Sequence, residues 1–258
     1  MWFYPKIIAH RGGGTLAPEN TIAALRCGLS YGFRAVEFDV MLSADGIPVL
    51  MHDPHFGRTV HAQGQVAQTS AAELGRFDAG SWFGAGFAGE PVPTYEQAVH
   101  FCKTNGIWMN VEIKPAPGHE AETGRIVGDV TRRLFAEEIA IAENDGKPHD
   151  PSGLPLFSSF SFDALMQAAR AAPAIPRGFL LDAILPGWHE QLKALEAVAL
   201  HTNHRKLSHR QAAEVKQAGY GLFCYTVNDP PRARELLEWG VDAFCTDRID
   251  LIGPDFAG

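Results

Sequence analysis

The stretch VALHTNHRKLSHRQAAEVKQAGYGLFCYTVNDPPRARELLEWG (198–240) alternates strand-like and helix-like runs twice. Residues 198–203 and 220–228 have the short, largely apolar pattern of buried strands. Residues 208–219 and 229–240 have apolar positions at helical spacing, and each run ends at a glycine. The stretch therefore predicts two consecutive strand–helix units.

The same alternation runs along most of the chain. The first predicted strand, KIIAH (6–10), precedes a helix that Asn20 or Thr21 can cap and that Gly32 can end. Eight strand-like runs precede helices, and eight such units in about 250 residues is the usual size of a (β/α)8 barrel. An open doubly wound sheet is the alternative, but no GxGxxG follows the first strand. We therefore expect an α/β fold, a TIM barrel, in a single domain over residues 1–258.

Two segments depart from this alternation. AVEFDVML (35–42) and IPVLMHD (47–53) both have strand character and are joined by SADG, which favours a hairpin turn. Residues 54–93 then form a small Gly-rich insertion after the second strand, with Trp82, Phe83 and Phe87 interleaved. This insertion is either a surface loop or a cap over the barrel mouth, because long insertions in compact domains are often functional. Farther on, a long helix is expected from about Ala121 to Ile141.

Composition limits the possible partners. The formal net charge is −8, and no long run of Lys or Arg offers a surface for nucleic acid or an anionic membrane. No apolar run approaches the ~18 residues that a membrane span needs. The four cysteines are widely spaced and form no CxxC, which indicates buried thiols. We expect a cytoplasmic protein; its oligomeric state stays open.

Three carboxylates stand on two of the predicted barrel strands. Glu37 and Asp39 are two residues apart in VEFDV and share a face of the strand, and Glu112 lies in NVEIK on the next barrel strand. Active sites of these barrels lie at the carboxyl ends of the strands, where such side chains gather. Buried carboxylates need a positive partner, and hard oxygen ligands suit Mg²⁺, Ca²⁺ or Mn²⁺. We expect one divalent cation on these three residues.

Basic side chains complete the set at the strand ends. His10 and Arg11 end the first strand, His52 ends the hairpin, and Lys114 shares a face with Glu112. A cation with Arg11 and Lys114 suits a phosphate ester, because positive charge can neutralise its nonbridging oxygens. Two histidines suit diester cleavage, in which a nucleophile loses a proton and an alkoxide gains one.

In chain order, AHRGGGTLAPENT, EFDVMLSADGIPVLMHD, NVEIKP, LLD, YTVN and CTDRIDL resemble the glycerophosphodiester phosphodiesterase family. The resemblance implies hydrolysis of small glycerophosphodiesters, such as glycerophosphocholine and glycerophosphoethanolamine, to an alcohol and sn-glycerol 3-phosphate. It implies a metal on Glu37, Asp39 and Glu112, phosphate contacts from Arg11 and Lys114, and an acid–base pair of histidines. The histidines match His10, which we assign as the base, and His52, which we assign as the acid.

Several positions and reactions stay open at this level. Glu19 is a candidate for a hydrogen-bond acceptor that supports the site from behind. Tyr225 stands where many relatives carry Trp. The nucleophile is either water or the glycerol 2-hydroxyl. A phospholipase C- or D-like enzyme acting on lipid and a noncatalytic phosphodiester-binding barrel are the alternative functions. A zinc amidohydrolase is disfavoured, because its first strand would carry HxH and here His10 stands alone.

Overall fold

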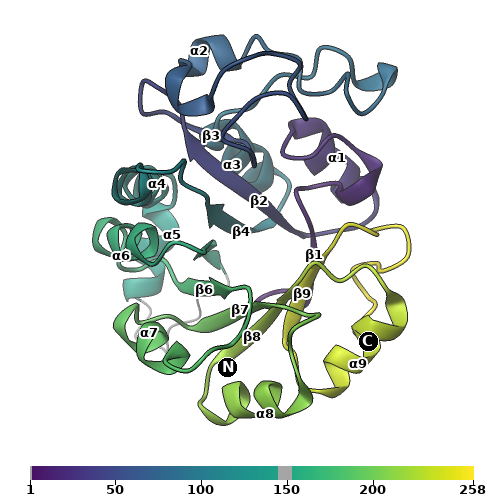
Figure 1. Ribbon diagram of the computed structural model, residues 1–258, viewed down its shortest axis with the longest axis vertical. Helices are drawn as coiled ribbons and strands as arrows, with labels where there is room; N and C mark the ends of the chain where they lie inside the picture. The colour runs from purple at the N-terminus through teal and green to yellow at the C-terminus, as the bar shows by residue number, and fades with distance from the viewer. Residues whose placement is uncertain (1, 145–152) are drawn as a thin grey trace.

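Eight short strands pair in parallel and close on themselves, because β1 pairs with both β2 and β9 (Figure 1). The computed structural model describes residues 2–144 and 153–258. The barrel strands are β1 (Ile7–Ala9), β2 (Ala35–Leu42), β4 (Trp108–Ile113), β5 (Leu156–Ser159), β6 (Arg177–Leu181), β7 (Ala199–Asn203), β8 (Gly221–Tyr225) and β9 (Ala243–Thr246). The predicted (β/α)8 TIM barrel is confirmed.

Helices surround the strands on the outside of the ring (Figure 1). The described helices are α1 (Ile22–Ser30), α2 (Ala71–Leu74), α3 (Tyr95–Thr104), α4 (Glu120–Leu134), α5 (Ala136–Asn144), α6 (Phe162–Ala171), α7 (Trp188–Ala194), α8 (His209–Gln217) and α9 (Pro230–Glu238). Of these, α2 lies in the 54–93 insertion and not in the ring. Thr21 caps α1, because its side chain accepts a hydrogen bond from the backbone N–H of Ala24. None of the described helices is long and apolar enough to cross a membrane.

The single long helix expected over 121–141 is wrong, because it is divided at Phe135 into α4 and α5. Phe135 leaves the helical conformation at φ −115° and is 2% exposed, so its ring packs into the main core. Burial of this ring is stabilising by roughly 2 kcal/mol.

The two faces of each strand carry different side chains. On β2, Val36, Phe38 and Val40 belong to the main hydrophobic cluster between barrel and helices. Glu37 and Asp39 alternate with them and point into the barrel, as the two-residue period predicts. A separate apolar cluster includes Tyr4, Ile8, Trp108, Leu156 and Phe223. Tyr4 precedes β1, Trp108 and Leu156 begin β4 and β5, and Ile8 and Phe223 lie at mid-strand. The cluster therefore lies towards the amino ends of the strands, whereas the polar side chains collect at the carboxyl ends.

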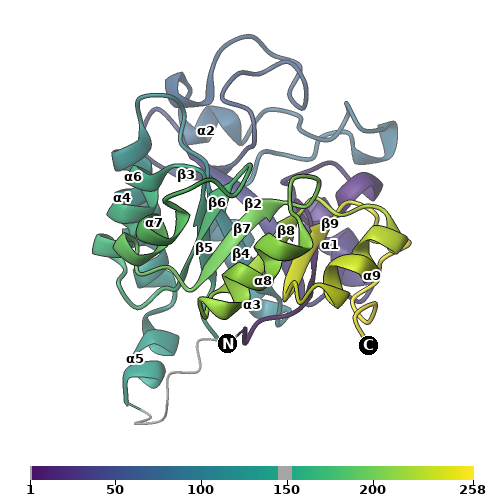
Figure 2. The same ribbon diagram turned by 60° about the horizontal axis from the view of Figure 1, so that its bottom comes forward.

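The hairpin strand β3 (Pro48–Leu50) pairs antiparallel with β2 and leads into the insertion. Residues 54–93 contain η2 (Val66–Gln68), α2 and η3 (Ala85–Phe87). The segment has its own hydrophobic cluster, in which Val60, Val66 and Leu74 pack with Met41 of β2. Figure 2 shows it at the top of the view, on the opposite side of the barrel from α5.

His201 on β7 is fully buried inside the barrel. Its ring stacks on Phe223 at 4.4 Å between centroids, and neither ring nitrogen has a hydrogen-bond partner among the described residues. A side chain at Gly178 of β6 would overlap Nε2 of His201, so this glycine makes room for the imidazole. Burial lowers the pKa of His201 from 6.5 to about 3, because no partner compensates the desolvation of the charged form.

We predict that His201 makes the protein sensitive to acid. The unfolded chain takes up a proton at pH 6.5 that the folded chain takes up only near pH 3, so the free energy of unfolding falls as pH falls through this window. Between pH 8 and pH 5 the loss should be about 2 kcal/mol. Urea unfolding at both pH values should show a smaller loss for His201→Phe than for the wild type. Equal losses would contradict a neutral buried imidazole.

Candidate active site

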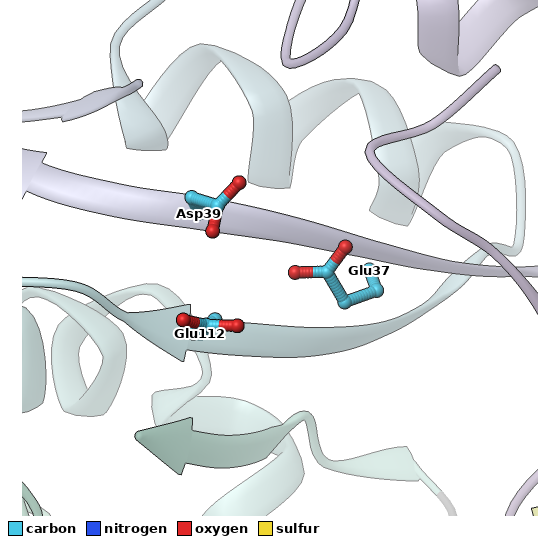
Figure 3. Close-up of side chains that lie close together, drawn as sticks. All are labelled: Glu37, Asp39 and Glu112. Carbon is cyan, nitrogen blue, oxygen red and sulfur yellow. The ribbon is translucent and has the colours of Figure 1, made fainter. Parts of the chain in front are cut away.

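Three carboxylates converge inside the barrel from two adjacent strands. Figure 3 shows Glu37 and Asp39 on β2 facing Glu112 on β4. Asp39 and Glu112 are Cα partners in the β2–β4 pairing, which fixes their side chains next to each other. One oxygen from each of the three lies within 4.8 Å of the others. The structure therefore brings together the three residues that the sequence predicts as metal ligands.

The cluster carries more negative charge than its neighbours compensate. Burial, and then the charge of Asp39, raise the pKa of Glu37 to about 8 and that of Glu112 to about 7. Oε1 of Glu37 is buried and has no hydrogen-bond partner among the described residues. Charged oxygens held this close suit a hard divalent cation, so the residues present fit the predicted metal.

Asp39 is the anchor for the positive side chains. Nε of Arg11 lies 3.4 Å and Nζ of Lys114 lies 3.5 Å from its two oxygens. Although burial acts against ionisation, these two charges hold the pKa of Asp39 down to about 2. Lys114 also donates to Glu112 at 3.2 Å. Asn20 lies behind the site, and its side chain both donates to Asp39 and accepts from the Asp39 backbone N–H.

The glycines after Arg11 allow the chain to pass close to the last barrel strand. Gly14 has φ +54°, and a side chain there would overlap the carbonyl oxygen of Asp247. The backbone N–H of Thr15 donates to this carbonyl at 2.9 Å. This close approach brings Asp247 to His10, although 237 residues separate them.

Each predicted catalytic histidine has an aspartate on Nδ1. His10 donates to Asp247 at 2.6 Å, and Asn228 in turn donates to Asp247 at 2.8 Å. His52 donates to Asp53 at 2.6 Å. A carboxylate on Nδ1 fixes the tautomer and leaves Nε2 available for chemistry. For His10 this nitrogen points towards the metal cluster, because Nε2 lies 3.7 Å from Glu37.

The electrostatic surroundings of the two histidines differ. Burial acts to lower the pKa of His10, but Asp247 and Glu37 raise it above its usual value. Burial lowers the pKa of His52, and the charges of Arg11 and Lys114 act in the same direction. The two rings therefore hold protons with different affinity in the cation-free protein.

A cavity of about 220 Å³ joins these groups. Its walls include six of the seven sequence-predicted residues: His10, Arg11, Glu37, His52, Glu112 and Lys114. Asp39 lies behind them, 1% exposed. Phe160 and Tyr225 form an aromatic pair on the wall, with ring centroids 5.7 Å apart. The described residues that line this cavity include none from 54–93.

Sequence reasoning gave Asp247 and Asp53 no role, and it considered Asn20 only as a helix cap, which the structure assigns to Thr21. Asp247 follows the last barrel strand directly, and this position, at the barrel end that carries the other polar groups, was the available signal. The candidate metal cluster among the described residues consists of carboxylates, which suit a hard cation better than zinc.

A closed parallel barrel with carboxylates, cationic side chains and two paired histidines at one end is typical of barrel hydrolases that act on phosphate esters. The sequence profile of the Glycerophosphoryl diester phosphodiesterase family matches residues 10–251. The chain belongs to this family and is a glycerophosphodiester phosphodiesterase.

Individual relatives agree with this assignment. A glycerophosphodiester phosphodiesterase of Caldanaerobacter subterraneus subsp. tengcongensis is 30% identical, with 93% of each chain covered. The structure of an Oleispira antarctica phosphodiesterase, in complex with the product sn-glycerol-3-phosphate, has TM-score 0.84 and 37% identity over 95% of this chain and 94% of that one. An Agrobacterium tumefaciens glycerophosphodiester phosphodiesterase has TM-score 0.76 and 25% identity over 98% of both chains.

We predict that a divalent cation stabilises the folded protein through the three carboxylates. At a hundredfold excess over its dissociation constant, Ca²⁺ or Mn²⁺ should raise the melting temperature by about 5–10 °C. Glu112→Gln should remove this shift, because the cluster loses one charged ligand. Glu137→Gln, on the exposed surface of α5, is the matched control and should keep it. An unchanged shift in Glu112→Gln would exclude Glu112 as a ligand.

Proposed function

We propose that this enzyme hydrolyses small glycerophosphodiesters, among them glycerophosphocholine and glycerophosphoethanolamine, to the free alcohol and sn-glycerol 3-phosphate. The observation that carries the proposal is one cavity walled by His10 and His52, each hydrogen-bonded to an aspartate, and by the carboxylates of Glu37 and Glu112. Acid–base groups next to a cation site are what cleavage of a phosphodiester requires. The product named for the Oleispira antarctica structure supports the glycerol phosphate half of the substrate.

In this proposal Glu37, Asp39 and Glu112 would hold one Mg²⁺, Ca²⁺ or Mn²⁺ ion. When bound, the ion would supply positive charge against the nonbridging phosphate oxygens. Arg11 and Lys114 bind and orient the phosphate from the same side of the cavity, because both line it and both are fixed on Asp39. A guanidinium and an ammonium in a partly buried wall stabilise charge more strongly than they would in water.

His10 and His52 then move the two protons of the reaction. One ring accepts a proton from the attacking hydroxyl through Nε2, and the other donates a proton to the departing alcohol oxygen. We assign His10 as the acceptor and His52 as the donor, as the sequence predicts. The carboxylate of Glu37 contributes to the raised pKa of His10 in the cation-free protein, and a cation bound at Glu37 would oppose that effect and favour a neutral His10 that accepts a proton.

Two further expectations accompany this function. All four cysteines are free, which supports a reducing compartment such as the cytoplasm. We also propose one domain over residues 1–258, because the 54–93 segment packs on Met41 of the barrel through a shared hydrophobic cluster.

The test of the function is direct. Purified protein should release sn-glycerol 3-phosphate from both glycerophosphocholine and glycerophosphoethanolamine, measured with a coupled glycerol 3-phosphate dehydrogenase. EDTA should abolish the reaction and a divalent cation should restore it. Glu137→Gln should behave as the wild type, whereas Glu112→Gln should lose most of its activity. No product from either substrate with any cation would contradict the proposal and favour a noncatalytic binding barrel.

The order of the two histidines can be tested with the leaving group. His10→Ala and His52→Ala should each lower kcat by about 10²- to 10⁴-fold on glycerophosphocholine. A nitrophenyl ester of glycerol 3-phosphate has a leaving group that needs no protonation. On this substrate the variant that lacks the acid should recover, so we expect recovery in His52→Ala. Recovery only in His10→Ala would reverse the assignment.

A further inference from the structure

Among the described residues, Arg58 is the side chain of the insertion that forms ion pairs next to the active site. Its partners are Glu19 and Asp53. Its guanidinium forms a fork on Glu19, with Nη1 and Nη2 donating to the two carboxylate oxygens at 2.6 and 2.7 Å. Nε of the same guanidinium donates to Asp53 at 2.6 Å. One side chain from the insertion therefore holds two carboxylates at once.

Both carboxylates also hold a group that lines the cavity. Oε1 of Glu19 accepts from Nη1 of Arg11 at 2.6 Å, and Oδ1 of Asp53 accepts from Nδ1 of His52 at 2.6 Å. The contacts form an unbroken series from Arg11 through Glu19, Arg58 and Asp53 to His52. The proposed phosphate-binding group and one proposed acid–base group are thus joined through a residue that does not itself line the cavity.

We propose that Arg58 is a positioning residue that sets the orientation of Arg11 and of His52 together. This inference rests on the proposed function of these two residues. Glu19 is 14% exposed and receives three N–H groups, so its carboxylate has a fixed plane against which Arg11 is aligned. Without Arg58, Glu19 keeps one hydrogen bond and Asp53 keeps one, and each carboxylate can rotate about its remaining contact.

The competing explanation is that Arg58 only fastens the insertion to the barrel. The side chain is 45% exposed, and ion pairs at such positions contribute about 0–1 kcal/mol to stability. The surrounding loop is held by its own backbone hydrogen bonds, from Gly57 to Val60 at 2.8 Å and from Phe56 to Gly64 at 3.1 Å. Loss of the guanidinium should therefore leave the insertion folded, which separates positioning from fastening by experiment.

The comparison is Arg58→Met against Arg76→Met. Arg76 lies in the same insertion and is exposed, and none of the described residues forms an ion pair with it, so this variant makes the same chemical change. We expect Arg58→Met to lower kcat/KM by about 10- to 100-fold, in the range seen when a residue supporting a site is lost. Its melting temperature should fall by no more than about 4 °C. Arg76→Met should match the wild type.

Two readouts distinguish positioning from fastening. The dissociation constant for sn-glycerol 3-phosphate should rise in Arg58→Met, because Arg11 is no longer aligned. The value of kcat should fall, because His52 is no longer aligned either. Guanidinium ion in the buffer should restore part of the activity of Arg58→Ala, since the site is open to solvent. Arg58→Lys should be less active than the wild type, because an ammonium cannot form the two parallel hydrogen bonds that the guanidinium makes to Glu19.

Double-mutant cycles then show whether Arg58 acts through its two carboxylates. Combined with Glu19→Gln or Asp53→Asn, the loss in Arg58→Met should be clearly smaller than additive. Additive losses, no guanidinium rescue, or equal kinetics in Arg58→Met and Arg76→Met would overturn the proposal. An inactive wild type would instead contradict the proposed function, and the product-binding comparison would still decide the role of Arg58.

Discussion

The structure depends on the burial of three carboxylates at one end of a closed barrel. Glu37, Asp39 and Glu112 are held by strand pairing, so they cannot move apart to relieve their repulsion. Arg11 and Lys114 compensate Asp39, and the raised pKa values of the other two show how much charge stays uncompensated. The same imbalance favours a cation at the proposed metal site and, with it, the proposed binding of a phosphate ester.

A second set of carboxylates organises the groups around this centre. Asp247 holds His10, Asp53 holds His52, and Glu19 holds Arg11. These acids come from three separate parts of the chain, and each fixes one donor by a short hydrogen bond. Because the acids are themselves tied by Asn228 and Arg58, the site is supported from behind on two sides. Precise orientation of this kind is what proton transfer requires.

Polar and apolar groups occupy different ends of the same barrel. Tyr4, Trp108 and Leu156 belong to an apolar cluster towards the amino ends of the strands, and the ionisable groups gather at the carboxyl ends. His201 lies at the boundary, stacked on Phe223 yet lining the active-site cavity. Its neutral, unpartnered imidazole lowers stability in acid, and Gly178 makes the space that it occupies. The imidazole that lowers the stability of the protein in acid is therefore also part of the active-site wall.

The sequence by itself determined the barrel and the seven residues that the structure places in the site. The two-residue period of a strand places Glu37 and Asp39 on one face of their strand, and Glu112 and Lys114 on one face of theirs. Turn and cap residues mark where the elements begin and end. Only the tertiary structure decided which residues support them. Asp247 reaches His10 because β9 closes the barrel against β1, and Arg58 reaches Glu19 and Asp53 because the insertion folds back towards α1. Phe135 breaks a helix for the same reason, since packing between distant segments outweighs local preference.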